Sequence, residues 1–121
     1  MNFASIFKSE PTCQTFTAGQ VLVREGEAND RMFIILAGEL EVRVGGKTVA
    51  RLKEGELFGE LSMIDQEPAS GDVVALTDGE FVTLDERRFL VVSQQNPFFT
   101  MGILRIVSAK LRAMNQTVAG A

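Results

Sequence analysis

The chain has 121 residues, 45% of them hydrophobic and 23% charged, a composition typical of a single globular domain. Its formal net charge of −4 and its scattered lysines and arginines exclude the basic patch that marks a nucleic-acid-binding surface. It has no histidine, one cysteine and no apolar run of about 18 residues, which excludes an internal disulfide, most metal sites, histidine-dependent catalysis and a membrane span.

The amino-terminal segment predicts a short packing helix. Phe3, Ile6 and Phe7 lie at helical spacing, and Pro11 is expected to end the helix. A lysine and a glutamate interrupt the apolar core that a secretion signal would need, so we expect a cytoplasmic protein. We expect Cys13 to be a buried or unremarkable thiol rather than a nucleophile.

Short β-branched and aromatic runs separated by glycines begin at Phe16. Their spacing predicts an antiparallel sandwich or barrel, which makes the fold mainly β with flanking helices. Gly45-Gly46 is typical of the two-residue turn of a hairpin. The expected strands are residues 21–23, 32–36, 40–44, 48–52, 73–76 and 81–84.

Two helices are expected at the carboxy terminus. Asp85 can cap the first, over residues 86–95, which ends at Asn96-Pro97, and the second begins at about Phe98. Apolar residues of the second helix are spaced 3, 4, 3, 4, as in a coiled-coil seam. This helix either packs on its own sandwich or pairs with a second copy in a homodimer. The seam is Leu104, Val107, Leu111, Met114 and Val118, and the basic residues off it are Arg105, Lys110 and Arg112.

Residues 58–76 are the stretch around which we expect the chain to be organised. Gly59 allows a close backbone approach, and the amides of Glu60, Leu61 and Ser62 would start a helical turn, where an anion can bind. The Glu60 carboxylate would repel an anion but could accept hydrogen bonds from sugar hydroxyls of the same ligand. The alternative is a tight turn with an exposed glutamate.

The chain carries several separated motifs in order: Phe16-Thr17-Ala18-Gly19, Glu25-Gly26-Glu27, Asp30, Met32-Phe33-Ile34-Ile35, Gly38, Gly55 and Phe58-Gly59-Glu60-Leu61-Ser62. In order and spacing they resemble the cyclic nucleotide-binding domain family, shared by the catabolite activator protein and the regulatory subunits of cAMP-dependent protein kinase. The resemblance covers nearly the whole chain, from about Phe3 to Met114.

The resemblance implies one domain over residues 1–121. Its parts would be an amino-terminal helix and lead (1–15), an antiparallel β-roll or jelly-roll sandwich (16–85) with a phosphate-binding cassette (58–76), and a pair of carboxy-terminal helices (86–121) that moves on ligand binding. Gly59, Leu61 and Ser62 would contact the ligand through their backbone, and Glu60 would hold the ribose 2′-hydroxyl. The implied ligand is a cyclic nucleotide such as cAMP or cGMP, without cofactor or metal.

The chain departs from the family at the arginine that pairs with the cyclic phosphate. Nine residues after the glutamate the chain has Ala69, or Ser70 if the alignment slides by one residue, and Asp65, Glu67 and Asp72 lie around the gap. A charged hydrogen bond is worth about 1.5 to 3 kcal/mol, so its loss should weaken binding roughly ten- to more than a hundredfold. Arg112 on the closing helix could supply a substitute cation.

Two functions are consistent with this sequence. One is a small regulatory module that senses a cyclic nucleotide weakly or non-standardly. The alternative is a ligand-free module for protein–protein interaction or dimerisation, with an unidentified protein partner. We do not expect an enzyme, because a metal-dependent β-barrel of the cupin type would need histidines. The sequence ends before any helix-turn-helix domain, so we expect a free-standing sensor or a fragment that does not read DNA.

Overall fold

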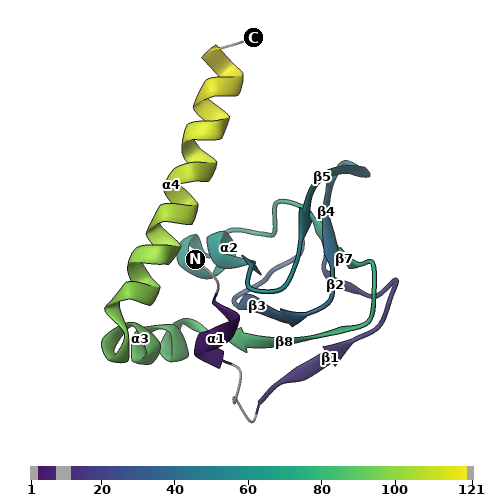
Figure 1. Ribbon diagram of the computed structural model, residues 1–121. Helices are drawn as coiled ribbons and strands as arrows, with labels where there is room; N and C mark the ends of the chain where they lie inside the picture. Colours follow the sequence, from purple (N-terminus) through teal and green to yellow (C-terminus); the bar gives the residue numbers. More distant parts are fainter. Residues whose placement is uncertain (1–2, 8–11, 120–121) are drawn as a thin grey trace. The chain divides into compact units, whose positions relative to one another are not determined.

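The computed structural model describes residues 3–7 and 12–119, which form two four-stranded sheets and four helices (Figure 1). The chain divides into two compact units, residues 1–87 and 88–121. The elements are α1 (Ala4–Phe7), β1 (Gln14–Phe16), β2 (Val21–Val23), β3 (Met32–Ala37), β4 (Leu40–Val44), β5 (Lys47–Leu52), β6 (Leu57–Phe58), α2 (Glu60–Asp65), β7 (Asp72–Ala75), β8 (Gly79–Leu84), α3 (Glu86–Gln95) and α4 (Pro97–Ala119).

Both sheets join strands that are far apart in the sequence. One sheet has the order β1-β8-β3-β6 and the other β2-β7-β4-β5, and every pairing is antiparallel. In the first sheet Gln14 pairs with Phe81, and in the second Val21 pairs with Val74. The predicted mainly β sandwich with a short amino-terminal helix and a carboxy-terminal helix pair is therefore confirmed.

The apolar core of the first unit draws side chains from both sheets. The rings of Phe33 and Phe58 stack with centroids 4.6 Å apart, and Phe81 is tilted against Phe33 at 5.6 Å. Burying an aromatic or branched side chain of this size contributes about 1.5–3 kcal/mol, so this cluster stabilises the contact between the sheets. Its members are Phe16, Val23, Phe33, Ile35, Leu40, Phe58, Ala69, Val73, Ala75 and Phe81.

The predicted hairpin at Gly45-Gly46 is confirmed, because Val44 pairs with Lys47 across it. The helix predicted over residues 86–95 is also found, and α4 begins one residue earlier than expected, at Pro97. Pro97 occupies the first helical position, where its missing N–H costs nothing. Among the described residues, no helix is both long and apolar enough to cross a bilayer.

Two strands differ from the prediction. The strands β1 and β6 were not predicted; they are three and two residues long, and each forms by pairing with a strand distant in the sequence. The amino-terminal helix is described over Ala4–Phe7, and Phe3 and Phe7 are buried as expected of a packing helix. Pro11, predicted to end it, lies outside the described residues.

Candidate functional site

The predicted cassette begins at Gly59, which fixes the entrance of α2. Gly59 is the N-cap of α2 and has a φ of 78°, a region in which L side chains are strained. A Cβ at this position would lie 2.5 Å from Arg31 O and 3.0 Å from Asn29 Nδ2. Asn29 Nδ2 itself donates to Arg31 O at 2.8 Å. Gly59 therefore lies against the loop that leads into β3, and its predicted close approach to a ligand stays a prediction.

The first turn of α2 combines backbone amides with a buried carboxylate. The Met63 amide donates to Gly59 O at 3.2 Å, so the amides of Glu60, Leu61 and Ser62 precede the first hydrogen bond of the helix. Glu60 is 1% exposed and Ser62 is 6% exposed, whereas Leu61 is 39% exposed. The alternative of a tight turn with an exposed glutamate is therefore wrong. A carboxylate at this depth forms strong hydrogen bonds, because little water competes for it.

The helix α2 ends at a second left-handed residue, Gln66. Its φ is 64°, and it is the one non-glycine residue with positive φ in the described part of the chain. The Gln66 amide donates to Ser62 O at 2.9 Å, and the Gln66 side chain donates from Nε2 to Met63 O at 2.9 Å. These bonds satisfy carbonyls of the last turn, so the helix has a defined end.

The return of the cassette is held by backbone hydrogen bonds at Ala69. The Gly26 amide donates to Ala69 O at 2.8 Å, and the Ala69 amide donates to Glu27 O at 2.9 Å. Ala69 is 7% exposed and belongs to the same apolar cluster as Phe58, whereas Ser70 is exposed. Of the two positions considered for the missing arginine, position 69 therefore has the side chain that faces the interior of the roll.

The acidic residues around the cassette act as acceptors for loop amides. Asp65 Oδ1 accepts from the Glu67 amide at 2.9 Å, directly after α2. Asp72 Oδ1 accepts from the Glu25 amide at 2.7 Å, and Glu25 Oε1 accepts from the Gly45 amide at 2.9 Å. These carboxylates hold the turn after α2 and the loops at the start of β7, which gives them a structural role at the edge of the cassette.

Glu41 on β4 is a buried carboxylate that was not predicted. It is 7% exposed; Arg43 Nε donates to Glu41 Oε1 at 2.6 Å, and Arg43 Nη2 forms an ion pair with the same oxygen. This hydrogen bond lowers the pKa of Glu41 against the opposing effect of desolvation. The sequence did contain a signal for this ion pair, because residues two apart on a strand lie on the same face and Glu41 and Arg43 carry opposite charges.

The cassette has no cation of its own, because residues 55–85 contain no lysine or arginine. The basic residue nearest in register is Arg43, which lies opposite Asp72 in the β4–β7 pairing. Its guanidinium is already engaged by Glu41. The arginine expected by the family resemblance is therefore not replaced from the adjacent strand β4.

Cys13 is exposed rather than buried. Its Sγ lies 3.9 Å from Glu80 Oε2 on β8. Desolvation and the neighbouring Glu80 carboxylate raise the pKa of the Cys13 thiol. A raised pKa reduces the reactive thiolate, so the chemistry agrees with the prediction that Cys13 is not a nucleophile.

Three residues of the seam predicted on α4 are exposed, and Val107 is half-buried. The exposed fractions are 55% for Leu104, 56% for Leu111 and 65% for Met114. The side chain of Val118 lies outside the described residues. Arg112, the predicted substitute cation, is exposed on α4 in the second compact unit. Pairing through this seam and the role of Arg112 stay predictions.

This chain is similar to a known domain family and to several known proteins. A family model described as "Cyclic nucleotide-binding domain" matches residues 13–96. A cGMP-dependent protein kinase of Caenorhabditis briggsae is 36% identical over 78 residues, which is 64% of this chain and 10% of the kinase. This chain therefore spans only a small part of that relative.

Two solved structures illustrate the likeness. The catabolite activator protein of Thermus thermophilus aligns with a TM-score of 0.80 at 24% identity, over 88% of this chain and 52% of that chain, and this likeness is one of fold. The regulatory subunit of a cAMP-independent protein kinase A from Trypanosoma brucei aligns with a TM-score of 0.60 at 28% identity, over 71% of this chain and 36% of that chain.

Proposed function

Because the chain belongs to the cyclic nucleotide-binding domain family, we propose that it is a regulatory module whose cassette, residues 58–76, binds a cAMP- or cGMP-like ligand weakly or non-standardly. The observation that supports this most is the buried Glu60 carboxylate at the start of α2, next to the left-handed Gly59. A buried carboxylate that follows a helix-opening glycine is suited to accept hydroxyl groups of a ligand. The role is regulatory rather than catalytic, and it needs no cofactor.

In this proposal the ligand is held mainly through its sugar. The Glu60 carboxylate accepts a hydrogen bond from the ribose 2′-hydroxyl, which the cyclic phosphate leaves free, and such a charge-assisted bond is about twice as strong as a neutral one. The backbone of Gly59, Leu61 and Ser62 contacts the phosphate side of the same ligand. Both contacts lie within one turn of α2, so they act on one bound molecule.

The phosphate of such a ligand meets an apolar wall where the family pattern has an arginine. Ala69 is buried with Phe58 in the apolar cluster, and the cassette has no lysine or arginine. Leaving the phosphate without a counter-charge removes about 1.5 to 3 kcal/mol of binding energy. The affinity for a cyclic nucleotide should therefore be only slightly higher than the affinity for the uncharged nucleoside with the same sugar and base. The Trypanosoma brucei neighbour described as cAMP-independent is consistent with this architecture serving a regulatory subunit without cAMP.

The test is isothermal titration calorimetry of the chain with cAMP, cGMP, adenosine and guanosine. We expect saturable but weak binding and a small affinity ratio between each cyclic nucleotide and its nucleoside. Glu60→Gln should weaken binding at least about tenfold, since it removes a charged acceptor. Glu67→Gln is the matched control, because Glu67 is an exposed acid of the same cassette. Equal affinity of the folded Glu60→Gln variant and the wild type would contradict the proposal.

A second candidate function is a ligand-free module for protein interaction or dimerisation. The observation that favours it is the exposure of Leu104, Leu111 and Met114 along one stripe of α4. Exposed apolar residues at a and d spacing are the pattern by which helices pair, here with a second copy in a homodimer. This function would be favoured over the sensor if none of the four compounds binds in calorimetry and the chain self-associates in sedimentation.

A further inference from the structure

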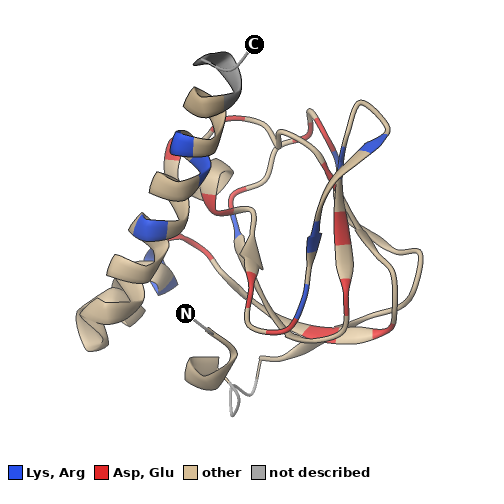
Figure 2. Ribbon diagram, turned by 45° about the horizontal axis from the view of Figure 1, so that its top comes forward, with Lys and Arg blue, Asp and Glu red and all other residues tan. Residues whose placement is uncertain are grey.

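Acidic residues are confined to the first of the two compact units. Residues 88–121 contain four basic residues and no aspartate or glutamate, and residues 1–87 contain eight basic and sixteen acidic residues. The formal charges are therefore +4 for the second unit and −8 for the first. Three of the four cations of the second unit lie on α4, where Figure 2 shows them in blue. This segregation points to a surface of the second unit that meets an acidic partner.

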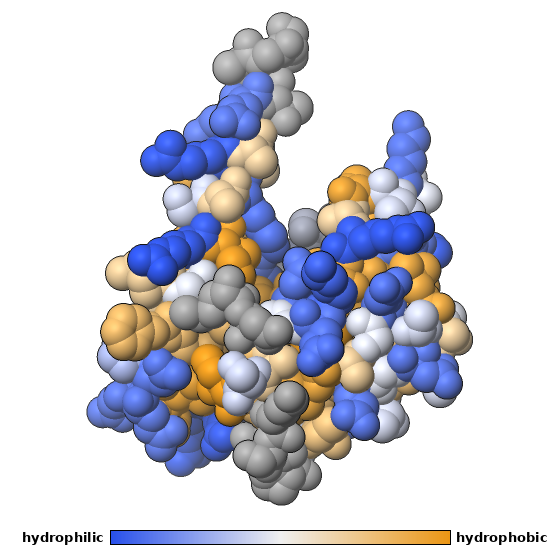
Figure 3. Space-filling model, viewed as in Figure 1, coloured by the Kyte–Doolittle hydropathy of each residue, from blue (hydrophilic) through white to orange (hydrophobic). Residues whose placement is uncertain are grey.

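The same helix exposes large apolar side chains beside its cations. Met101 is 47% exposed and Leu104 is 55% exposed on α4, and Leu90 is 60% exposed on α3. In Figure 3 hydrophobic and hydrophilic surfaces alternate along α4. Large apolar residues exposed together, rather than singly, mark binding surfaces.

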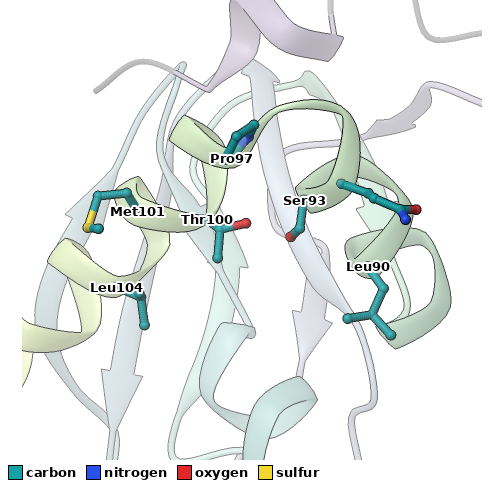
Figure 4. Close-up of a pocket in the computed structure, with 7 residues that line it drawn as sticks. Leu90, Ser93, Pro97, Thr100, Met101 and Leu104 are labelled. Carbon is teal, nitrogen blue, oxygen red and sulfur yellow. The ribbon is translucent and has the colours of Figure 1, made fainter.

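These residues line an open groove between α3 and α4, about 610 Å³ in volume. Figure 4 shows Leu90 and Ser93 on the α3 side and Thr100, Met101 and Leu104 on the α4 side. Within the described part of the chain, the hydroxyl oxygens of Ser93 and Thr100 are buried at this groove without a hydrogen-bond partner. The groove is open and mostly apolar, so it suits inserted side chains better than an enclosed small molecule.

The groove continues along α4 into a recess of about 390 Å³ that carries two arginines. Met101 and Leu104 line both parts, and Arg105 and Arg112 line the recess. The two arginines are seven residues apart, so about 10.5 Å of helix separates them. Both are exposed, and in the described part of the chain neither forms an ion pair.

We propose that this groove binds an acidic amphipathic helix of a partner protein. Apolar residues of the partner at i, i+3 or i+4, and i+7 would fill the groove over Leu90, Met101 and Leu104. Acidic residues two turns apart on the partner would meet Arg105 and Arg112, where a carboxylate can engage each guanidinium with two parallel hydrogen bonds.

Charge and shape favour this occupant over two others. A second copy of α4 would bring the same arginines and no acid, and the acidic residues of residues 1–87 lie in a unit whose longest described helix has six residues, too short to place two acids two turns apart. An anionic bilayer is flat, whereas the apolar residues line a concave groove between two helices. The dimer seam predicted on α4 shares one residue, Leu104, with this groove, so peptide binding is distinct from pairing through the seam. Peptide binding also does not depend on cyclic nucleotide binding in the cassette.

The test uses the full chain and a display library of helical peptides with randomised charged and apolar positions. We expect the selected peptides to be acidic and to carry apolar residues at i, i+3 or i+4, and i+7. Binding of the best peptide, measured by fluorescence anisotropy, should weaken at least about tenfold in Arg105→Glu/Arg112→Glu, because two attractive contacts become repulsive. Replacing the acidic residues of the peptide by lysine should restore binding to this variant.

The matched control is Arg24→Glu, which reverses an exposed arginine of the β-roll and should leave the peptide affinity unchanged. Circular dichroism checks that each variant folds. The proposal is overturned if no peptide binds, if the selected peptides are neutral or basic, or if reversing Arg105 and Arg112 leaves their affinity unchanged. It is also overturned if phosphatidylserine vesicles bind through these arginines while peptides do not, or if sedimentation shows a second copy on this face.

Discussion

Ala69→Arg tests whether the cassette lacks only a counter-charge. Ala69 is 7% exposed and faces the interior of the roll, so an arginine there would point inward. Its guanidinium is a planar fork of donors that can engage two oxygens of a cyclic phosphate. A charged hydrogen bond is worth about 1.5 to 3 kcal/mol, which corresponds to an affinity gain of roughly tenfold to more than a hundredfold. We therefore expect the affinity for cAMP or cGMP to rise at least about tenfold in calorimetry.

The burial of position 69 predicts that Ala69→Arg lowers the stability of the protein when no ligand is bound. The side chains around position 69 are apolar, so an unpaired guanidinium there loses its hydration, a penalty of about several kcal/mol even after relaxation of the site. Ala69→Arg should therefore melt at a lower temperature than the wild type, and cyclic nucleotide should raise that temperature. Ala69→Gln is the control, because it adds a polar side chain without charge and should bring little gain.

A second substitution shows whether the gain comes from the cassette. Adding Glu60→Ala to Ala69→Arg should remove much of the gained affinity, because the ribose and phosphate contacts act on one ligand. Adenosine, which has no phosphate, should bind Ala69→Arg no better than it binds the wild type. If Ala69→Arg folds normally and gains no affinity for any cyclic nucleotide, the pocket is blocked or reshaped, and the interaction module replaces the sensor as the better account.

Three further predictions concern the helices and the β4 ion pair. If the α4 seam pairs two copies, Leu111→Glu should shift the species toward monomer in sedimentation without unfolding the β-roll; a monomeric wild type at high micromolar concentration would refute the pairing. Thr100→Val removes a buried hydroxyl without a partner, so it should stabilise the protein by about 1 kcal/mol in denaturant unfolding, and a loss of stability would refute this. The pKa of Glu41 is lowered by Arg43, so the pair stabilises the folded state above the ordinary carboxyl pKa, and this contribution disappears as the pH falls through the lowered value. Arg43→Gln should therefore be less stable than the wild type at neutral pH, with a difference that shrinks in acid.

Features set by local chemistry could be predicted from the sequence. The Gly45-Gly46 turn, the strand cores and the helix over residues 86–95 follow from glycine, β-branched residues and proline within a few positions of each other. The strands β1 and β6 could not be predicted, because Gln14–Phe16 and Leu57–Phe58 lack the alternating β-branched residues that mark the equally short β2, Val21–Val23. Their structure comes from partners far along the chain, such as Phe81 for Gln14 and Phe33 for Phe58.

The candidate site shows the same division. The glycine at position 59 and the helix start after it could be predicted from residue types alone. The burial of Glu60 could not, because it depends on how α2 packs on the roll. Nor could the sequence decide between Ala69 and Ser70 as the place of the missing arginine. The backbone bonds of Ala69 to Gly26 and Glu27 accompany an inward-facing side chain, a feature that no local pattern indicates.

The two caps of α2, Gly59 and Gln66, both have positive φ but differ in how well they should tolerate substitution. At position 59 any side chain meets both backbone strain and Arg31 O at 2.5 Å, so two independent penalties protect the glycine. At position 66 the chain already carries a side chain at positive φ, so the costs of a substitution there are this backbone strain and the loss of the Gln66 side-chain bond to Met63 O. Glycine or asparagine there would relieve that strain while keeping the amide bond to Ser62 O. In a library of functional variants, position 66 should therefore accept several residue types, whereas position 59 should remain glycine.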